Sequence, residues 1–187
     1  TNLLIASATA LVTALCLRDL GVNFVATVLA ALGLAFATFT WPYISYDFSE
    51  LLQALTLIVA YWLLVRAVRV GLRKPALIAA SGAFLGFAVF TKAALVILIP
   101  AYGYYLWANM KPTLGNEKLP LAWFTAPLLS WFTIMAILNW YRFSSPWDFG
   151  YGSEAAQFTT PLWTGLYGLL LGPNKGLIFY APLTLLL

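Results

Sequence analysis

Candidate chemistry begins in a short polar segment, residues 41–50, which reads Trp-Pro-Tyr-Ile-Ser-Tyr-Asp-Phe-Ser-Glu. Its two acids, Asp47 and Glu50, could act as a general base or bind a metal or a sugar hydroxyl. A structural interpretation competes with this one, because the two acids have the spacing of a helix capping box, and acids favour the first turn of a helix. The two interpretations are compatible, since a capping acid can also face a site.

The second candidate segment is Thr91-Lys92, a tight link between two apolar runs. Free N–H groups at the start of the following helix attract anions, and Lys92 adds a positive charge at the same place. The segment therefore predicts a phosphate site at the level of the lipid headgroups. The structural alternative is a lysine whose stem lies along apolar surface while its ammonium group reaches water.

The third candidate segment, residues 139–152, mixes aromatic rings with Arg142 and Asp148. The planar guanidinium of Arg142 can bind a phosphate through two hydrogen bonds, and Tyr141 and Asp148 are suited to a sugar. The structural alternative is a surface loop anchored by its aromatic residues, with Arg142 paired to Asp148 or to lipid.

The fourth candidate residue is Lys175, in the Gly-flanked turn 172–176. It could supply a second phosphate contact, although the spacing is not that of a nucleotide-binding P-loop. A plain turn is the alternative. No haem, zinc or nucleic-acid signature is present, so the sequence predicts no nucleic-acid partner. The chain has no histidine and one cysteine, which excludes imidazole metal sites, Ser-His-Asp and Cys-His catalysis and an internal disulfide within this chain; no metal ligand is predicted.

The composition indicates whether the chain lies in water or in lipid. Of 187 residues, 63% are hydrophobic and 9% are charged, with a net charge of +4; typical soluble proteins have about 25% charged residues. So few charges cannot cover a soluble globule, and so apolar a chain is not disordered. Most of the chain is therefore expected to lie in lipid.

Apolar stretches predict the elements that position the polar segments. A membrane helix needs about 20 mostly apolar residues. Six stretches approach this length: Asn2–Leu17, Val22–Thr40, Leu51–Val65, Ala76–Phe90, Ala93–Trp107 and Leu121–Leu138. A seventh begins near Leu177. The predicted fold is an all-α integral membrane bundle of six to seven transmembrane helices. Residues 1–187 are taken as one transmembrane domain, an internal piece of a longer chain.

Loops 41–50 and 139–176 are expected on the outside, and the second carries a short interfacial helix from Pro161 to Leu171 with Thr160 before it. Alternate loops on the opposite side hold seven of the ten cations, which places that side in the cytoplasm. The spacing of Gly82 and Gly86 predicts a close helix–helix contact.

In these external motifs the sequence resembles the polyprenyl-phosphate-sugar-dependent glycosyltransferases of the GT-C membrane fold, a group that includes the dolichyl-phosphate-mannose–protein mannosyltransferases and the bacterial aminoarabinose transferases. The resemblance rests on three segments: 40–51; 82–92; and 139–152 together with 165–168 and 173–176. It implies a lipid-linked sugar donor, a polyprenyl phosphate leaving group and transfer on the extracytoplasmic side.

The resemblance also implies roles for single residues. Glu50 matches an acidic position that opens a luminal helix, and Lys92 matches the basic residue after a Gly-rich helix, a lipid-phosphate contact. Arg142 and Lys175 lie in family-like motifs without individual roles. The family's main catalytic acid would lie upstream of Thr1. Family members that use a metal with a His ligand are a poor guide here, because this chain has no His. The cofactor is therefore left unknown, with a divalent metal as an open alternative that the sequence does not indicate.

The sequence therefore predicts a membrane glycosyltransferase, placed in the bacterial cytoplasmic membrane with its site facing the extracytoplasmic side. Its expected partners are a polyprenyl-phosphate sugar and membrane lipid. Two alternatives remain. The first is a non-catalytic membrane subunit that scaffolds a complex. The second is a transporter or flippase, which has less support because charged residues are scarce at mid-membrane depth.

Overall fold

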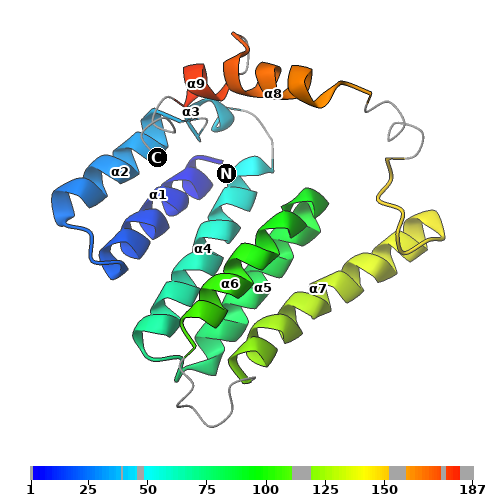
Figure 1. The fold of residues 1–187 in the computed structure, drawn as a ribbon, viewed down its shortest axis with the longest axis horizontal. Helices are drawn as coiled ribbons and strands as arrows, with labels where there is room; N and C mark the ends of the chain where they lie inside the picture. Colours follow the sequence, from blue (N-terminus) through cyan, green and yellow to red (C-terminus); the bar gives the residue numbers. More distant parts are fainter. Residues whose placement is uncertain are drawn as a thin grey trace.

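The computed structural model describes residues 2–38, 40–45, 49–110, 119–151, 159–173 and 176–181. Every regular element in these ranges is a helix (Figure 1). The elements are α1 (Asn2–Asp19), α2 (Phe24–Phe36), α3 (Thr40–Tyr43), α4 (Glu50–Arg69), α5 (Pro75–Thr91), the 3₁₀ helix η1 (Ala93–Leu98), α6 (Ile99–Ala108), α7 (Leu119–Phe143), α8 (Leu162–Leu171) and α9 (Leu177–Tyr180). The all-helical prediction is confirmed for this part of the chain.

Three of these helices, α1, α4 and α7, are long and apolar enough to cross a membrane. The apolar helices α2, α5, η1–α6 and α8 are shorter. The composition and these three helices agree with a membrane protein, and the described residues establish no larger number of crossings. The predicted seventh span corresponds to α9, which has four residues, and residues 182–187 lie outside the described ranges.

The long helices form a row in the order α2, α1, α4, α5 and α7, and α6 packs beside α4 and α7 (Figure 1). Its core consists of fully buried apolar residues, including Ala60 and Leu64 of α4, Leu85 of α5 and Leu106 of α6. Two side-chain hydrogen bonds fix α4 in the middle of the row. Ser81 Oγ donates to the Ala60 carbonyl at 2.7 Å, and the Tyr102 hydroxyl donates to the Leu57 carbonyl at 2.9 Å.

Glycines on α5 allow α7 to approach closely, as their spacing predicts. A Cβ at Gly82 would overlap the backbone carbonyl of Phe124, and a Cβ at Gly86 would lie 2.6 Å from Cδ1 of Trp131. Because glycine has no side chain, the two backbones come together and bury Phe124 at the contact. This contact sets the position of α7, which carries part of the candidate site.

Several boundaries differ from the sequence-based prediction. The segment expected as one helix, Ala93–Trp107, divides into η1 and α6 because Pro100 has no N–H to bond the Val96 carbonyl; the Ile99 N–H bonds that carbonyl instead. The predicted external loop 139–176 begins later, because α7 continues through Phe143 and its aromatic residues keep their helical bonds. Helix α8 begins at Leu162, so Pro161 is its N-cap and not its first residue.

The row has two chemically different ends. Asp19 at the end of α1 contacts Arg66 and Arg69 at the end of α4. Glu50 at the start of α4 contacts Lys92 after α5, at the opposite end. Helix α8 runs across this second end (Figure 1), and none of its residues is buried.

Candidate functional site

Antiparallel packing brings three of the predicted site residues to one end of the row. The turn after α4 reverses the chain through Gly71 and Leu72, both in the left-handed backbone region, and the Leu72 N–H bonds the Ala67 carbonyl at 2.8 Å. Helix α5 therefore returns alongside α4, and Lys92 at its end reaches Glu50 at the start of α4.

Glu50 and Lys92 form an ion pair that leaves one carboxylate oxygen unused. Lys92 Nζ lies 3.7 Å from Glu50 Oε1, and the two side chains are 47% and 40% exposed, respectively. Glu50 Oε2 is buried and has no hydrogen-bond partner among the described residues. A buried acceptor without a donor is generally unfavourable by about 1–3 kcal/mol.

The start of α4 corrects the capping-box interpretation. The helix begins at Glu50, with Ser49 as its N-cap, so Glu50 is the first helical residue and not the third. Ser49 makes no side-chain cap bond, and its Oγ accepts a hydrogen bond from Gln53 Nε2 at 2.8 Å. Asp47, the other predicted acid, lies outside the described residues. Glu50 is thus in the first turn, where the helix dipole favours a carboxylate, without acting as a cap partner.

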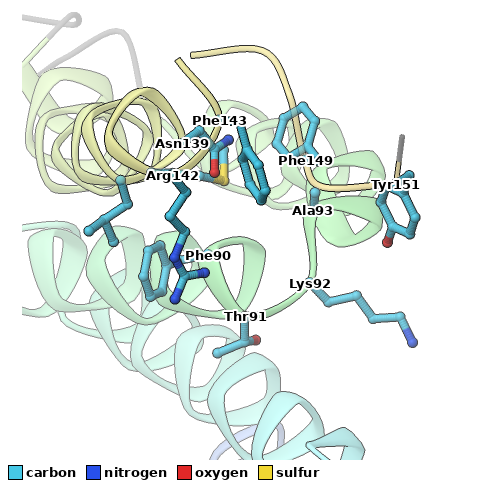
Figure 2. A pocket seen from close by; sticks show the side chains of 11 residues that line it. Phe90, Thr91, Lys92, Ala93, Asn139, Arg142, Phe143, Phe149 and Tyr151 are labelled. Atoms are coloured by element: carbon cyan, nitrogen blue, oxygen red, sulfur yellow. The ribbon is translucent and has the colours of Figure 1, made fainter. Parts of the chain in front are cut away.

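An open pocket of about 310 Å³ lies between the ends of α5 and α7. Its walls are the Phe90–Ala93 segment, one face of α7 from Met135 to Phe143, and Phe149 and Tyr151 from the following loop. Figure 2 shows that Arg142 extends from α7 toward Phe90 and Thr91. Lys92 forms part of the rim and points away from the cavity (Figure 2), which agrees with its contact to Glu50. The pocket therefore has Arg142 between aromatic, aliphatic and polar side chains, with Lys92 at its rim.

The chain after α7 turns back onto the pocket through two unusual backbone conformations. Ser144 has φ +58° and ends the helix, with its N–H bonded to the Trp140 carbonyl at 2.8 Å. Gly150 has φ +78°, and its N–H bonds Asp148 Oδ1 at 2.8 Å. A Cβ at Gly150 would lie 2.8 Å from Cζ of Phe143, so glycine allows the loop to pack on this ring and bring Tyr151 to the pocket.

The predicted site residues therefore divide into groups. Lys92 and Arg142 line the pocket, and Glu50 contacts Lys92. Tyr141 is 87% exposed and does not line the pocket. Asp148 belongs to the turn at Gly150 and, among the described residues, forms no ion pair with Arg142. Lys175 lies outside the described residues.

Sequence reasoning selected the segment 139–152 as a whole but did not name Asn139, Phe149 or Tyr151 as individual site residues, and all three line the pocket. The Gly-Tyr-Gly sequence at 150–152 was the available signal for Tyr151, because glycine at 150 marks a turn that returns the chain. Asn139 shapes the same loop, since its Nδ2 donates to the Pro146 carbonyl at 3.3 Å. In the part of the chain that the structure describes, no three His, Cys, Asp or Glu side chains come together, so we assign no metal ligand set.

The fold and this site define an all-helical chain that agrees with a membrane protein and has a cationic pocket at one end of its helix row. No family model, curated protein or solved structure matches the chain. The function proposed below is therefore argued from the chemistry of the pocket alone.

Replacing Gly150 with Ala is expected to loosen the loop over the pocket. The new Cβ is strained at this φ, which by itself favours other conformations by about 1–2 kcal/mol, and it also meets the Phe143 ring. Hydrogen–deuterium exchange of residues 145–151 should become roughly fivefold faster or more. Gly165→Ala in α8 is the control, because no atom lies within 4 Å of its Cβ; equal exchange in both variants would contradict the role of Gly150.

Proposed function

We propose that this chain belongs to an integral membrane glycosyltransferase that moves a sugar from a polyprenyl-phosphate donor to an acceptor. The proposal rests on one observation: Arg142 and Lys92 line the same pocket, and Lys92 pairs with Glu50, a carboxylate with one oxygen that has no hydrogen-bond partner among the described residues. A site for a lipid-linked phosphate needs cations next to apolar side chains. Glycosyl transfer to a hydroxyl also needs a base that accepts the proton of the hydroxyl.

The donor would bind through its phosphate. Arg142 offers a planar set of N–H donors that matches phosphate oxygens, and it extends into the space between α7 and α5 (Figure 2). Apolar side chains from both helices, including Phe90, Met135 and Leu138, line the same pocket and would contact the prenyl chain or the sugar ring. Tyr151 at the edge of the pocket supplies a hydroxyl for the sugar.

The transfer step follows from these positions. An acceptor oxygen or nitrogen attacks the anomeric carbon, the bond from this carbon to the phosphate oxygen breaks, and the electron pair of that bond remains on the phosphate. Arg142 and Lys92 stabilise the charge that develops on the leaving phosphate. Glu50 accepts the acceptor's proton on its unused oxygen.

A topology with six crossings fits this chemistry. We infer that α1, α2, α4, α5, η1–α6 and α7 all cross the membrane, with α8 lying at the surface. The end with Arg66 and Arg69 would then be cytoplasmic by the positive-inside rule, and the pocket would face the extracytoplasmic side of the bacterial cytoplasmic membrane. The described residues leave a divalent metal cofactor open.

Removing either one of the two cations, Lys92 or Arg142, tests the proposal. Lys92→Gln and Arg142→Gln should each lower transfer by the full-length protein roughly 10-fold to 100-fold with polyprenyl-phosphate sugars, because each removes a charge-assisted contact worth about 1.5–3 kcal/mol. Arg18→Gln, the same change at the opposite end of the row, is the control and should leave transfer unchanged. Full activity in Lys92→Gln and Arg142→Gln would remove the phosphate site.

The alternative function, a non-catalytic membrane subunit, is favoured by a different observation. The Glu50–Lys92 ion pair joins α4 to α5, and such a pair can act in structure alone. This alternative predicts that the wild-type protein releases no polyprenyl phosphate with any sugar donor, and that Lys92→Gln changes only thermal stability.

A further inference from the structure

The end of the helix row opposite the pocket carries a group of ordered cations. Asp19, at the end of α1, accepts a hydrogen bond from Trp62 Nε1 at 2.8 Å, and its carboxylate also contacts Arg66 Nε at 3.6 Å and Arg69 Nη1. The Arg66 guanidinium lies 5.1 Å from the centre of the Trp62 ring. One carboxylate thus holds two arginines side by side at the end of α4.

Asp19 holds these two arginines in place but leaves most of their N–H donors available. The Asp19 side chain is 23% exposed, whereas Arg66 and Arg69 are 51% and 55% exposed. Each guanidinium has five N–H donors, and a single carboxylate cannot engage most of them. The remaining donors therefore face the surroundings at a fixed place.

The adjoining turn adds two further cations. Arg73 and Lys74 are exposed and form no ion pair within the described ranges. Near them the short segments between helices expose apolar side chains, with Val70 at 39% and Leu20 at 47%. We call Arg66, Arg69, Arg73 and Lys74, with Asp19 between the first two, the basic end patch; its local charge is strongly positive.

We propose that the basic end patch binds the headgroups of anionic phospholipids in the leaflet at this end of the row. Helix α4 is long and apolar enough to cross a membrane, and a helix that crosses has its last turn where the lipid headgroups are. Trp62 is a residue type that favours this boundary. Four cations beside exposed apolar side chains match a phosphate joined to an acyl chain, and Asp19 sets the spacing of the two arginines. This inference does not rest on the proposed function.

Binding of phosphatidylglycerol and of phosphatidylcholine with the same acyl chains tests the patch, measured by native mass spectrometry of the full-length protein in detergent. We expect phosphatidylglycerol to bind at least about fivefold more tightly, with the preference decreasing as salt is added. Arg73→Gln/Lys74→Gln should weaken phosphatidylglycerol binding about tenfold or more without unfolding, because neither residue pairs with a described acid. Lys92→Gln/Arg142→Gln, which changes two cations at the other end, should leave this site occupied.

Three results would overturn the proposal: equal binding of the two lipids in the wild-type protein, loss of phosphatidylglycerol in Lys92→Gln/Arg142→Gln but not in Arg73→Gln/Lys74→Gln, or full displacement of the lipid by an equal concentration of inorganic phosphate. The last result would assign the patch to free phosphate. The lipid comparison on the wild-type protein needs no variant, so it decides the matter even if a variant fails to fold.

Discussion

Glu50→Gln is expected to lower the turnover of sugar transfer about 100-fold or more, the range in which a positioned general base contributes. Glutamine keeps the shape of the side chain but cannot accept a proton at the oxygen that is unused in the wild-type site. The variant should still fold, because the exposed Glu50–Lys92 pair contributes about 1 kcal/mol or less to stability. The measurement is the rate of polyprenyl-phosphate release with saturating donor, together with thermal unfolding in detergent.

A charge exchange distinguishes the base from the ion pair. Glu50→Lys/Lys92→Glu places a carboxylate and an ammonium group at the same two positions in reverse, so it can keep the contact between α4 and α5. The exchange moves the carboxylate from the start of α4 to the end of α5, away from the position that Glu50 Oε2 occupies in the wild-type protein. We expect the exchanged variant to be as stable as the wild-type protein and to remain inactive. Recovered transfer in this variant would show that Glu50 acts only as a partner of Lys92.

The second large effect is expected at the contact between α5 and α7. Gly82→Ala forces a methyl group into the Phe124 carbonyl, and because the obstacle is backbone, the two helices must separate. Overpacking of this kind lowers the free energy of unfolding by about 1–3 kcal/mol. Since α7 carries Arg142 and α5 leads to Lys92, the displacement should also reduce donor binding. Thermal unfolding in detergent and the KM for donor are the two measurements.

Gly103→Ala is the matched control for Gly82→Ala. Gly103 lies within α6, and no atom is within 4 Å of the position of its Cβ. Alanine favours a helix over glycine by about 0.5–1 kcal/mol, so this variant should be as stable as the wild-type protein or more so. If both alanine variants were equally stable, α5 and α7 would not be in the close contact that the structure describes.

Much of the helix pattern could be predicted from the sequence because it depends on local properties. Apolar runs separated by polar residues predicted α1, α2, α4 and α5 to within a few residues, and also the start of α7. The spacing of Gly82 and Gly86 predicted a close contact, which the structure confirms against α7. The alternation of charged loops placed Arg66 and Arg69 at the end opposite Lys92, as observed.

Helix ends and loops were predicted less well, because they depend on competition between neighbouring bonds. The sequence placed Glu50 third in a capping box, whereas α4 starts at Glu50 and Ser49 bonds Gln53. It ended α7 at Leu138, whereas α7 continues to Phe143. Polar and aromatic residues are compatible with both a helix and a loop, so composition did not distinguish the two.

From residue type and local order, the sequence by itself predicted helices, a composition typical of a membrane protein, and cations on opposite sides of the helices; the described residues confirm the helices and place Arg66 and Arg69 at the end opposite Lys92. Only the tertiary structure decided which groups meet. Glu50 contacts Lys92 across 42 positions of the chain, Asp19 holds Arg66 and Arg69, and Gly150 returns Tyr151 to the pocket. Such contacts arise when helices distant in sequence pack together, and packing depends on side-chain shape along whole helices, which a local pattern does not encode.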